Sequence, residues 1–227
     1  SELREKNDVY PCFCTRAELH AVSAPHAGDG AFRYPGLCRN LSPAEVEEKS
    51  RTRRPSLRFR APEGAVTFND LYCGPQSIDV QSTFGDFIVR RSDGVHAYQL
   101  AVTVDDALMG VTEVIRGRDL LPSTGCQMQL FQALDHAPPR YGHIPLLVNK
   151  EGRRLSKRER DLDIGVLRTR FTPEELLGRM ANLLGLLDRP EKITPTELIP
   201  VYKAWFTRTG TPKFPENCVV PDNFAIK

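Results

Sequence analysis

The stretch VTEVIRGRDLLPSTGCQMQLFQALDHAPPRYGHIPLLV, residues 111–148, decides the fold. Its apolar and β-branched residues predict strands over 111–115 and 144–148, with a helix over about 119–134 between them. A connection of this length between two strands predicts a βαβ unit, in which the strands are parallel and the crossover is right-handed. The fold class expected from this stretch is α/β.

Two positively charged segments follow the strands of this unit. Ligands of open α/β sheets bind beyond the carboxyl ends of the strands, and those ends are Arg116-Gly117 and the loop 149–158. An anionic substrate is therefore expected at this edge. A lysine in the loop, Lys157, would stabilise the charge that builds up on a triphosphate during in-line displacement. By charge alone, a solvated basic loop is the better interpretation.

A turn signal precedes the unit. Ser92-Asp93-Gly94 lies between residues 87–91 and 96–104, and an Asp-Gly pair between two such runs predicts a β-hairpin. Residues 87–91 and 96–104 are therefore expected to be its two strands.

Helix-start signals occur at three places. Each combines a capping residue, a proline at the first helical position and a glutamate three residues after the cap. The three capping residues are Ser42, Thr172 and Thr194. Leucines at helical spacing follow Thr172, so residues 161–207 are predicted to be helical.

Three of the six cysteines lie close together near the start of the chain: Cys12, Cys14 and Cys38. Six cysteines in 227 residues are too few for a disulfide scaffold, and a grouped set favours metal binding. Zn²⁺ prefers tetrahedral sulfur and nitrogen ligands, and a site closed by four protein ligands is structural. Ligand chemistry alone favours His20 or His26 as the fourth ligand. Three unrelated thiols are the alternative.

The composition is that of an ordinary globular protein, with 40% hydrophobic and 26% charged residues and a net charge of +2. No apolar run approaches the ~20 residues of a membrane span, and no secretory signal opens the chain, so a cytoplasmic location is expected. Basic residues cluster in 51–60 and 153–160. Such clusters can contact phosphates, but a solvated face is their more common role.

Four segments match a known family in order and spacing. Residues 154–158, RLSKR, resemble the KMSKS loop of class I aminoacyl-tRNA synthetases in the variant form of the glutamyl enzymes. Residues 97–106, AYQLAVTVDD, resemble the segment AYQLAVVVDD, and residues 114–124, VIRGRDLLPST, are similar to VVRGxDLLxST. Tyr141-x-His143-x-Pro145-Leu146 leads into the loop as in the family. Together the matches cover residues 83–160.

This resemblance implies a class I aminoacyl-tRNA synthetase catalytic domain of the Rossmann type. Residues 83–160 would form its second half with the KMSKS-like loop. Residues 1–82 would form a zinc-bearing insertion of the acceptor-binding type, and residues 161–227 a helical region that resembles a stem-contact region. No anticodon-binding domain is expected. The family's HIGH signature is absent from this sequence, so we expect the first nucleotide-binding half to be missing and the chain to be incomplete for activity.

The resemblance also assigns roles to residues. Tyr98 and Arg116 would bind L-glutamate, because an arginine grips a carboxylate bidentately and a tyrosine hydroxyl bonds a polar group. Lys157 would be the catalytic residue and, with Ser156, would bind ATP, which is accompanied by Mg²⁺. Without the resemblance, structural roles are favoured for both residues. Tyr98 would be a strand tyrosine packed on the sheet, and Arg116 would form a capping or surface ion pair.

A short branch of the family, which glutamylates queuosine in tRNA(Asp), is similar to this chain in its cysteine pattern. The branch has Cys-x-Cys and later a tyrosine four residues before a third cysteine. Here these are Cys12, Cys14, Tyr34 and Cys38. This resemblance moves the fourth ligand of one structural Zn²⁺ from histidine to Tyr34, although the segment before Tyr34 is longer than the branch implies. The C-terminal sequence also resembles that of the branch.

The function implied by the resemblance has two steps. The enzyme would activate L-glutamate with ATP and then transfer the glutamate to the queuosine base at the wobble position of tRNA(Asp). A monomer is expected. Two alternatives stay open. One is the catalytic part of a discriminating glutamyl-tRNA synthetase that charges tRNA(Glu). The other is a zinc-bearing RNA-binding module without catalysis, supported by the cysteines and the arginines of residues 51–60.

Overall fold

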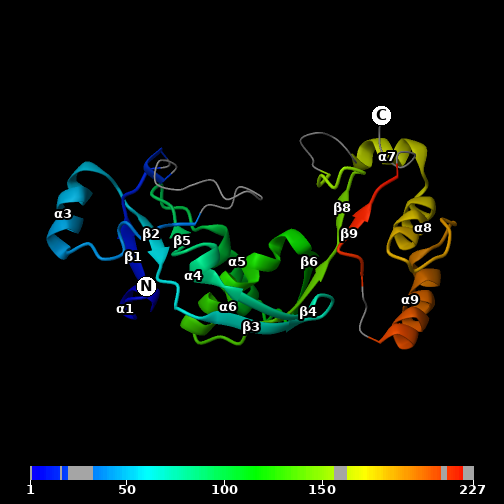
Figure 1. The fold of residues 1–227 in the computed structure, drawn as a ribbon, viewed down its shortest axis with the longest axis horizontal. Coiled ribbons are helices and arrows are strands. Elements are labelled where there is room, and N and C mark those ends of the chain that lie inside the picture. Colours follow the sequence, from blue (N-terminus) through cyan, green and yellow to red (C-terminus); the bar gives the residue numbers. More distant parts are fainter. Residues whose placement is uncertain (1, 16, 20–32, 156–162, 211–213, 222–227) are drawn as a thin grey trace. The chain divides into compact units, whose positions relative to one another are not determined.

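The computed structural model describes residues 2–15, 17–19, 33–155, 163–210 and 214–221. The chain forms two compact units, and Figure 1 shows its course. The first unit comprises Ser1–Asn69, Pro75–Val114 and Leu120–Tyr141. The second comprises Asp70–Gly74, Ile115–Asp119 and Gly142–Lys227. Each unit is thus assembled from segments that are distant in the sequence.

An antiparallel sheet of three strands, in the order β1-β2-β5, lies in the first unit (Figure 1). Its strands are β1 (Val9–Cys12), β2 (Ser56–Phe59) and β5 (Ile88–Arg90). Phe59 and Val89 are 2% exposed and belong to the main apolar core of this unit. The rings of Phe59 and Phe87 lie 5.3 Å apart between centroids. This sheet fixes the position of Cys12 at the end of β1.

The predicted hairpin after β5 is only partly correct. The turn forms, since Gly94 has a φ of +95° and Arg90 makes one antiparallel bridge with His96. The strand predicted over 96–104 is wrong, because the chain enters a helix, α5 (Tyr98–Leu108). β-branched residues in this run favour a strand, but the structure places the run in a packed helix.

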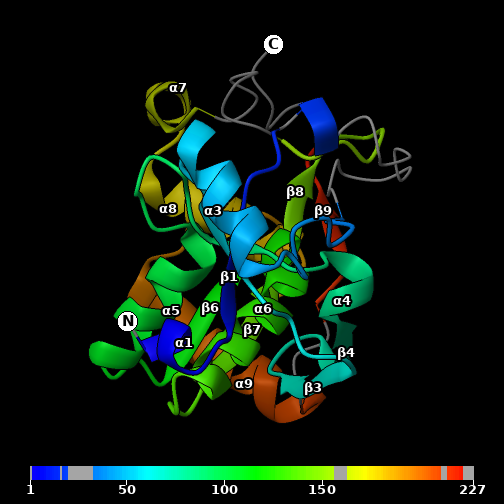
Figure 2. The same ribbon diagram turned by 90° about the vertical axis from the view of Figure 1, so that its left-hand side faces the viewer.

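The packing of α5 explains why the helix prevails. It lies beside α6 (Leu121–Ala133) in the first unit (Figure 2). The buried Thr103 donates its hydroxyl proton to the Gln99 carbonyl, 2.8 Å away and one turn earlier. Gln127 of α6 donates to the side-chain oxygen of Gln99 at 2.9 Å. The first bond lies within α5, whereas the second links α5 to α6, and such packing can override a local strand preference.

The predicted order of strand, helix and strand is confirmed with shifted bounds. β6 (Glu113–Gly117) leads through a 3₁₀ turn, Arg118–Leu120, into α6 and then to β7 (Arg140–Ile144), which is the hydrogen-bonded neighbour of β6. The single strand predicted over 144–148 is split into β7 and β8 (Leu146–Val148). Pro145 lies at the break, and it has no N–H to continue a ladder.

All three predicted helix starts are confirmed. They open α3 (Pro43–Thr52), α8 (Pro173–Leu183) and α9 (Pro195–Thr209). Ser42, Thr172 and Thr194 each accept a hydrogen bond from the amide of the glutamate three residues later, and that glutamate accepts one from the amide of the capping residue. Satisfying these free amides at the first turn stabilises each helix start.

The second unit contains a parallel pairing that the sequence did not predict. β9 (Asn217–Val219) pairs with β8, with Leu147 opposite Cys218. The other named elements of the chain are α1 (Glu2–Glu5), β3 (Ala65–Asp70), β4 (Gly74–Asp79), α4 (Val80–Thr83) and α7 (Ile164–Arg170). Within the described ranges, none of the helices has the length and apolar character to cross a bilayer.

Candidate functional site

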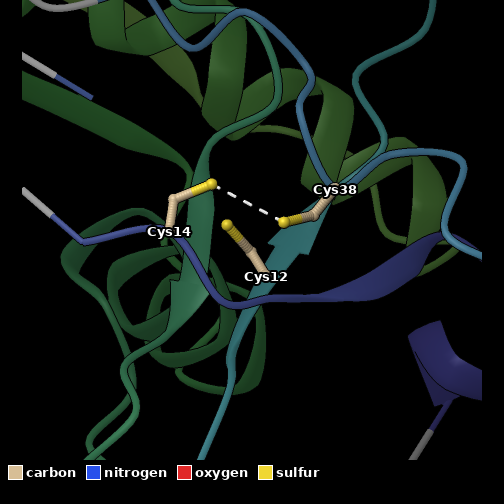
Figure 3. A group of neighbouring side chains, drawn as sticks. All are labelled: Cys12, Cys14 and Cys38. Carbon is tan, nitrogen blue, oxygen red and sulfur yellow. Dashed lines mark hydrogen bonds between the residues drawn. The ribbon is translucent and has the colours of Figure 1, made fainter. Parts of the chain in front are cut away.

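Three thiols converge in the first unit, where β1 ends. Cys12 is the last residue of β1, Cys14 follows two residues later, and Cys38 comes from the segment before α3 (Figure 3). Their Sγ atoms lie within 4.8 Å of one another, and those of Cys14 and Cys38 are 3.6 Å apart. Cys12 and Cys38 are buried, and Cys14 is partly buried. The three thiols thus lie close together, as a shared metal site would require.

The hydroxyl of Tyr34 joins the three thiols. Its oxygen lies 3.5 Å from Sγ of Cys12 and 3.8 Å from Sγ of Cys14, and it accepts a hydrogen bond from the amide of Cys38 at 2.8 Å. The side chain is buried, with 3% exposure. His20 and His26, the ligands that chemistry alone favoured, lie outside the described residues.

These separations can be compared with what a metal ion would impose. A tetrahedral Zn²⁺ with bonds of about 2.3 Å to sulfur and 2.0 Å to oxygen holds two sulfur atoms about 3.8 Å apart and a sulfur and an oxygen about 3.5 Å apart. The 3.6 Å between two thiols and the 3.5 and 3.8 Å from the phenol oxygen to sulfur have this spacing. These three separations, together with the chemistry of three thiols and one phenol, fit donors around a tetrahedral zinc ion.

A buried arginine lies against this cluster. Arg58 of β2 is 6% exposed, and its Nε donates to Sγ of Cys12 at 3.2 Å. Burial would raise the pKa of Cys12, but hydrogen bonds from Tyr34 and Arg58 outweigh it and the pKa is lowered. Burial raises the pKa of Cys14 to about 12, and the neighbouring Cys12 adds to the effect. The expectation of a solvated face for residues 51–60 therefore fails at Arg58.

A second cluster lies in the second unit, around Arg116 of β6. The Nε atom of Arg116 donates to Nε2 of His143 at 3.0 Å. On the other side of the imidazole ring, Nδ1 of His143 lies 2.6 Å from Oδ2 of Asp70, and the side chains of both residues are 0% exposed. Sequence reasoning missed Asp70, which no motif marks, and gave His143 no role.

The carboxylate of Asp70 is held by the backbone. Its Oδ1 accepts hydrogen bonds from the amides of Tyr72, Cys73 and His143 at 2.9–3.0 Å. Burial would raise the pKa of Asp70, but hydrogen bonds from His143 and from these amides outweigh it, so the pKa is lowered. Burial lowers the pKa of His143 although Asp70 acts against it. A neutral imidazole thus lies beside an ionised carboxylate.

The basic loop begins as a tight turn on β8. The amide of Asn149 donates to the Arg153 carbonyl at 2.9 Å, and that of Leu155 donates to the Leu147 carbonyl at 3.0 Å. Nη1 of Arg154 lies 2.6 Å from Oδ2 of Asp119, which follows β6. This ion pair connects the loop to the carboxyl end of β6. The sequence predicted that these two segments lie at one edge of the sheet.

The remaining predicted site residues lie elsewhere. Tyr98 is the first residue of α5 in the first unit and is 52% exposed, so the interpretation of a strand tyrosine packed on the sheet is wrong. Ser156 and Lys157 lie outside the described residues. A common substrate site for Tyr98, Arg116 and Lys157 stays a prediction.

The α/β architecture and these clusters agree with one class of protein. The family model described as "tRNA synthetases class I (E and Q), catalytic domain" matches residues 1–199. The chain belongs to this family.

Individual relatives narrow the resemblance further. The Glutamyl-Q tRNA(Asp) synthetase of Symbiobacterium thermophilum is 47% identical over 207 residues, which are 89% of this chain and 64% of that protein. The Glutamyl-Q tRNA(Asp) synthetase of Nitratidesulfovibrio vulgaris is 49% identical over 182 residues, 79% of this chain and 56% of that protein. The glutamate–tRNA ligase of Sulfurihydrogenibium sp. is 34% identical and covers 89% of this chain and 43% of that protein. The chain thus spans 43–64% of the length of these curated relatives.

Solved structures share the fold. A glutamate tRNA ligase from Elizabethkingia meningosepticum, crystallised in complex with its amino acid, superposes with a TM-score of 0.68 over 96% of this chain and 47% of that one. The sequence identity is 24%, so this likeness concerns the fold alone. It supports the class I synthetase catalytic fold that the motifs predicted.

Proposed function

We propose that the full-length protein that contains this chain activates L-glutamate with ATP and transfers it to the queuosine base at the wobble position of tRNA(Asp). The observation that carries the proposal is the pattern of similarity over 89% of the chain. Over that share, a Glutamyl-Q tRNA(Asp) synthetase is 47% identical and a glutamate–tRNA ligase is 34% identical. The anchored Arg116 at the end of β6 adds a cation that suits a carboxylate.

The proposed first step joins two anions. A carboxylate oxygen of glutamate attacks the α-phosphorus of ATP, the bond to the β-phosphate breaks, and pyrophosphate leaves. Arg116 and Tyr98 would hold glutamate, while Lys157 and Ser156 would hold the phosphates of ATP with Mg²⁺. In the second step a hydroxyl of the queuosine cyclopentenediol attacks the carbonyl carbon of the adenylate, and AMP leaves. The contribution of the protein is positioning and charge neutralisation.

The thiol cluster serves a different purpose in this proposal. Cys12, Cys14, Tyr34 and Cys38 would hold one structural Zn²⁺, which cross-links the end of β1 to the segment before α3. We also assign residues 1–82 to the insertion that carries this metal, residues 83–160 to the second half of the catalytic domain and residues 161–227 to the stem-contact-like region. A closed site of four protein ligands leaves the ion no open position for chemistry.

The experiment that tests the function uses the full-length protein. Glutamate-dependent exchange of pyrophosphate into ATP is expected without tRNA. Labelled glutamate is then offered with tRNA(Asp) that carries queuosine, with the same tRNA from cells unable to make queuosine, and with tRNA(Glu). Label is expected on the first tRNA alone, and nuclease fragments should place it in the anticodon arm.

Two other outcomes define the alternatives. Label at the 3′ end of tRNA(Glu) would instead support a glutamyl-tRNA synthetase, which the 44% identity to a glutamate–tRNA ligase of Alkalilimnicola ehrlichii keeps as second candidate. RNA binding that falls steeply with salt, without any pyrophosphate exchange, would support a non-catalytic zinc-bearing module.

A further inference from the structure

The contact between Arg116 and His143 fixes the tautomer of the histidine. A guanidinium group only donates hydrogen bonds and stays protonated in proteins. Because Nε of Arg116 donates to Nε2 of His143 at 3.0 Å, that nitrogen must be a bare acceptor. The imidazole proton therefore resides on Nδ1, from which it is donated to Oδ2 of Asp70 at 2.6 Å.

The direction of this chain of contacts is set by the backbone. Oδ1 of Asp70 accepts from three amides, so the carboxylate cannot turn without leaving them unsatisfied in a buried place. Oδ2 is consequently aimed at His143, and the ring plane of His143 is aimed at Arg116. The side chains of Asp70 and His143 are both fully buried, which shields their hydrogen bond from competition by bulk water. The backbone amides thus fix Asp70, which orients His143, and His143 in turn orients the guanidinium of Arg116.

We propose that Asp70 and His143 are positioning residues that fix the orientation of the Arg116 guanidinium for a substrate carboxylate. This inference rests on the proposed function, in which Arg116 binds glutamate. A bidentate grip on a carboxylate depends on the plane in which the guanidinium lies. Neither Asp70 nor His143 needs to touch the substrate. Their effect is transmitted through Nε of Arg116.

The substitution Asp70→Asn tests this arrangement without changing its size. Three backbone N–H groups donate to the Oδ1 position, so the side-chain oxygen of the asparagine must lie there. Its NH₂ group then takes the place of Oδ2 and donates to Nδ1 of His143. The imidazole proton must then move to Nε2, where it faces the N–H of Arg116. An orienting carboxylate that selects a histidine tautomer is known to be sensitive to this change. The guanidinium is expected to turn away.

Steady-state pyrophosphate exchange by the full-length protein gives the main readout. For Asp70→Asn and His143→Leu, the KM for glutamate is expected to rise about tenfold or more while the KM for ATP is unchanged. His143→Gln can still donate to Asp70 and accept from Arg116, so it should recover part of the loss. The matched control is His136→Leu, because His136 is exposed in the first unit and has no part in the proposed site.

The outcomes separate this inference from the proposed function. Wild-type protein without glutamate-dependent exchange would overturn the function. If the wild-type protein is active but Asp70→Asn and His143→Leu keep its KM for glutamate, the positioning role is overturned. Equal rises in the KM for glutamate and the KM for ATP would also overturn it. The ¹⁵N chemical shifts of His143 test the tautomer in the wild-type protein even where a variant fails to fold. A bare Nδ1, or a doubly protonated ring near pH 7, would overturn the inference.

Discussion

The guanidinium carbon of Arg58 lies 3.6 Å from the centroid of the Tyr34 ring. The same guanidinium donates through Nε to Sγ of Cys12 at 3.2 Å and through Nη1 to the Asp86 carbonyl at 2.7 Å. A zinc ion with three thiolates and a phenolate carries excess negative charge, and a buried cation beside it offsets that charge. Arg58 would therefore support the proposed metal site through its ligand Cys12.

Replacing Arg58 should weaken zinc binding. Arg58→Met keeps most of the side-chain volume but removes the charge and the bond to Cys12. Zinc affinity is expected to fall about tenfold or more, because partners of metal ligands carry effects of this size. Competition with a chromogenic chelator measures it. Arg51→Met is the control, since Arg51 is exposed and pairs with the exposed Glu47. Equal affinities in both variants would contradict the role given to Arg58.

Removing the hydroxyl of Tyr34 should weaken the site directly. Tyr34→Phe keeps the ring under Arg58 but deletes the oxygen near the thiols, so zinc affinity should drop by more than about tenfold. The absorption bands of Co²⁺ bound in place of zinc should also shift. Tyr10→Phe is the control, because Tyr10 is buried in the apolar core around Cys12 and Cys38 but its hydroxyl donates to Asp86 at 2.6 Å. It should lose stability and keep its zinc. Unchanged cobalt bands in Tyr34→Phe would rule out this ligand.

Gly85 should tolerate no side chain. A Cβ there would lie 2.2 Å from the Tyr34 carbonyl oxygen, and the residue has a φ of +65°. Gly85→Ala is expected to cost more than about 2 kcal/mol of unfolding free energy and to displace Tyr34 from the thiols. Gly64→Ala isolates the backbone strain, because Gly64 has a φ of +95° and nothing within 4 Å. It should cost about 1 kcal/mol and leave zinc binding unchanged. Chemical denaturation with zinc in excess compares the two.

Stability of the second unit should fall in mild acid. Burial lowers the pKa of His143, and the positive charge of Arg116 lowers it further. Asp70 and Asp119 raise this pKa but do not outweigh the lowering. A depressed folded-state pKa means that stability is fully present above the unfolded value of about 6.5 and is lost as pH falls through the folded value. Fluorescence of Trp205, the single tryptophan, follows unfolding in this unit. His143→Gln should flatten the loss between pH 7 and pH 5. An equally steep loss in that variant would refute this assignment.

Local signals predicted the helix starts because they involve neighbours in the chain. The Ser42, Thr172 and Thr194 capping boxes need a glutamate only three residues away, so the sequence contains the whole interaction. The alternation of strand and helix around α6 is equally local. The strand predicted over 96–104 is wrong because the β-branched residues of this run favour a strand in isolation, whereas the packing of α5 against α6 involves residues remote in the sequence.

The sequence by itself determined the family, the candidate metal-ligating cysteines and the candidate substrate arginine, because these depend on which residues occur and in what order. Only the tertiary structure decided what surrounds them. It buried Arg58 against Cys12 and joined Asp70 to His143 across 73 positions. No local pattern encodes such pairs, because burial and distance arise only when remote segments pack together.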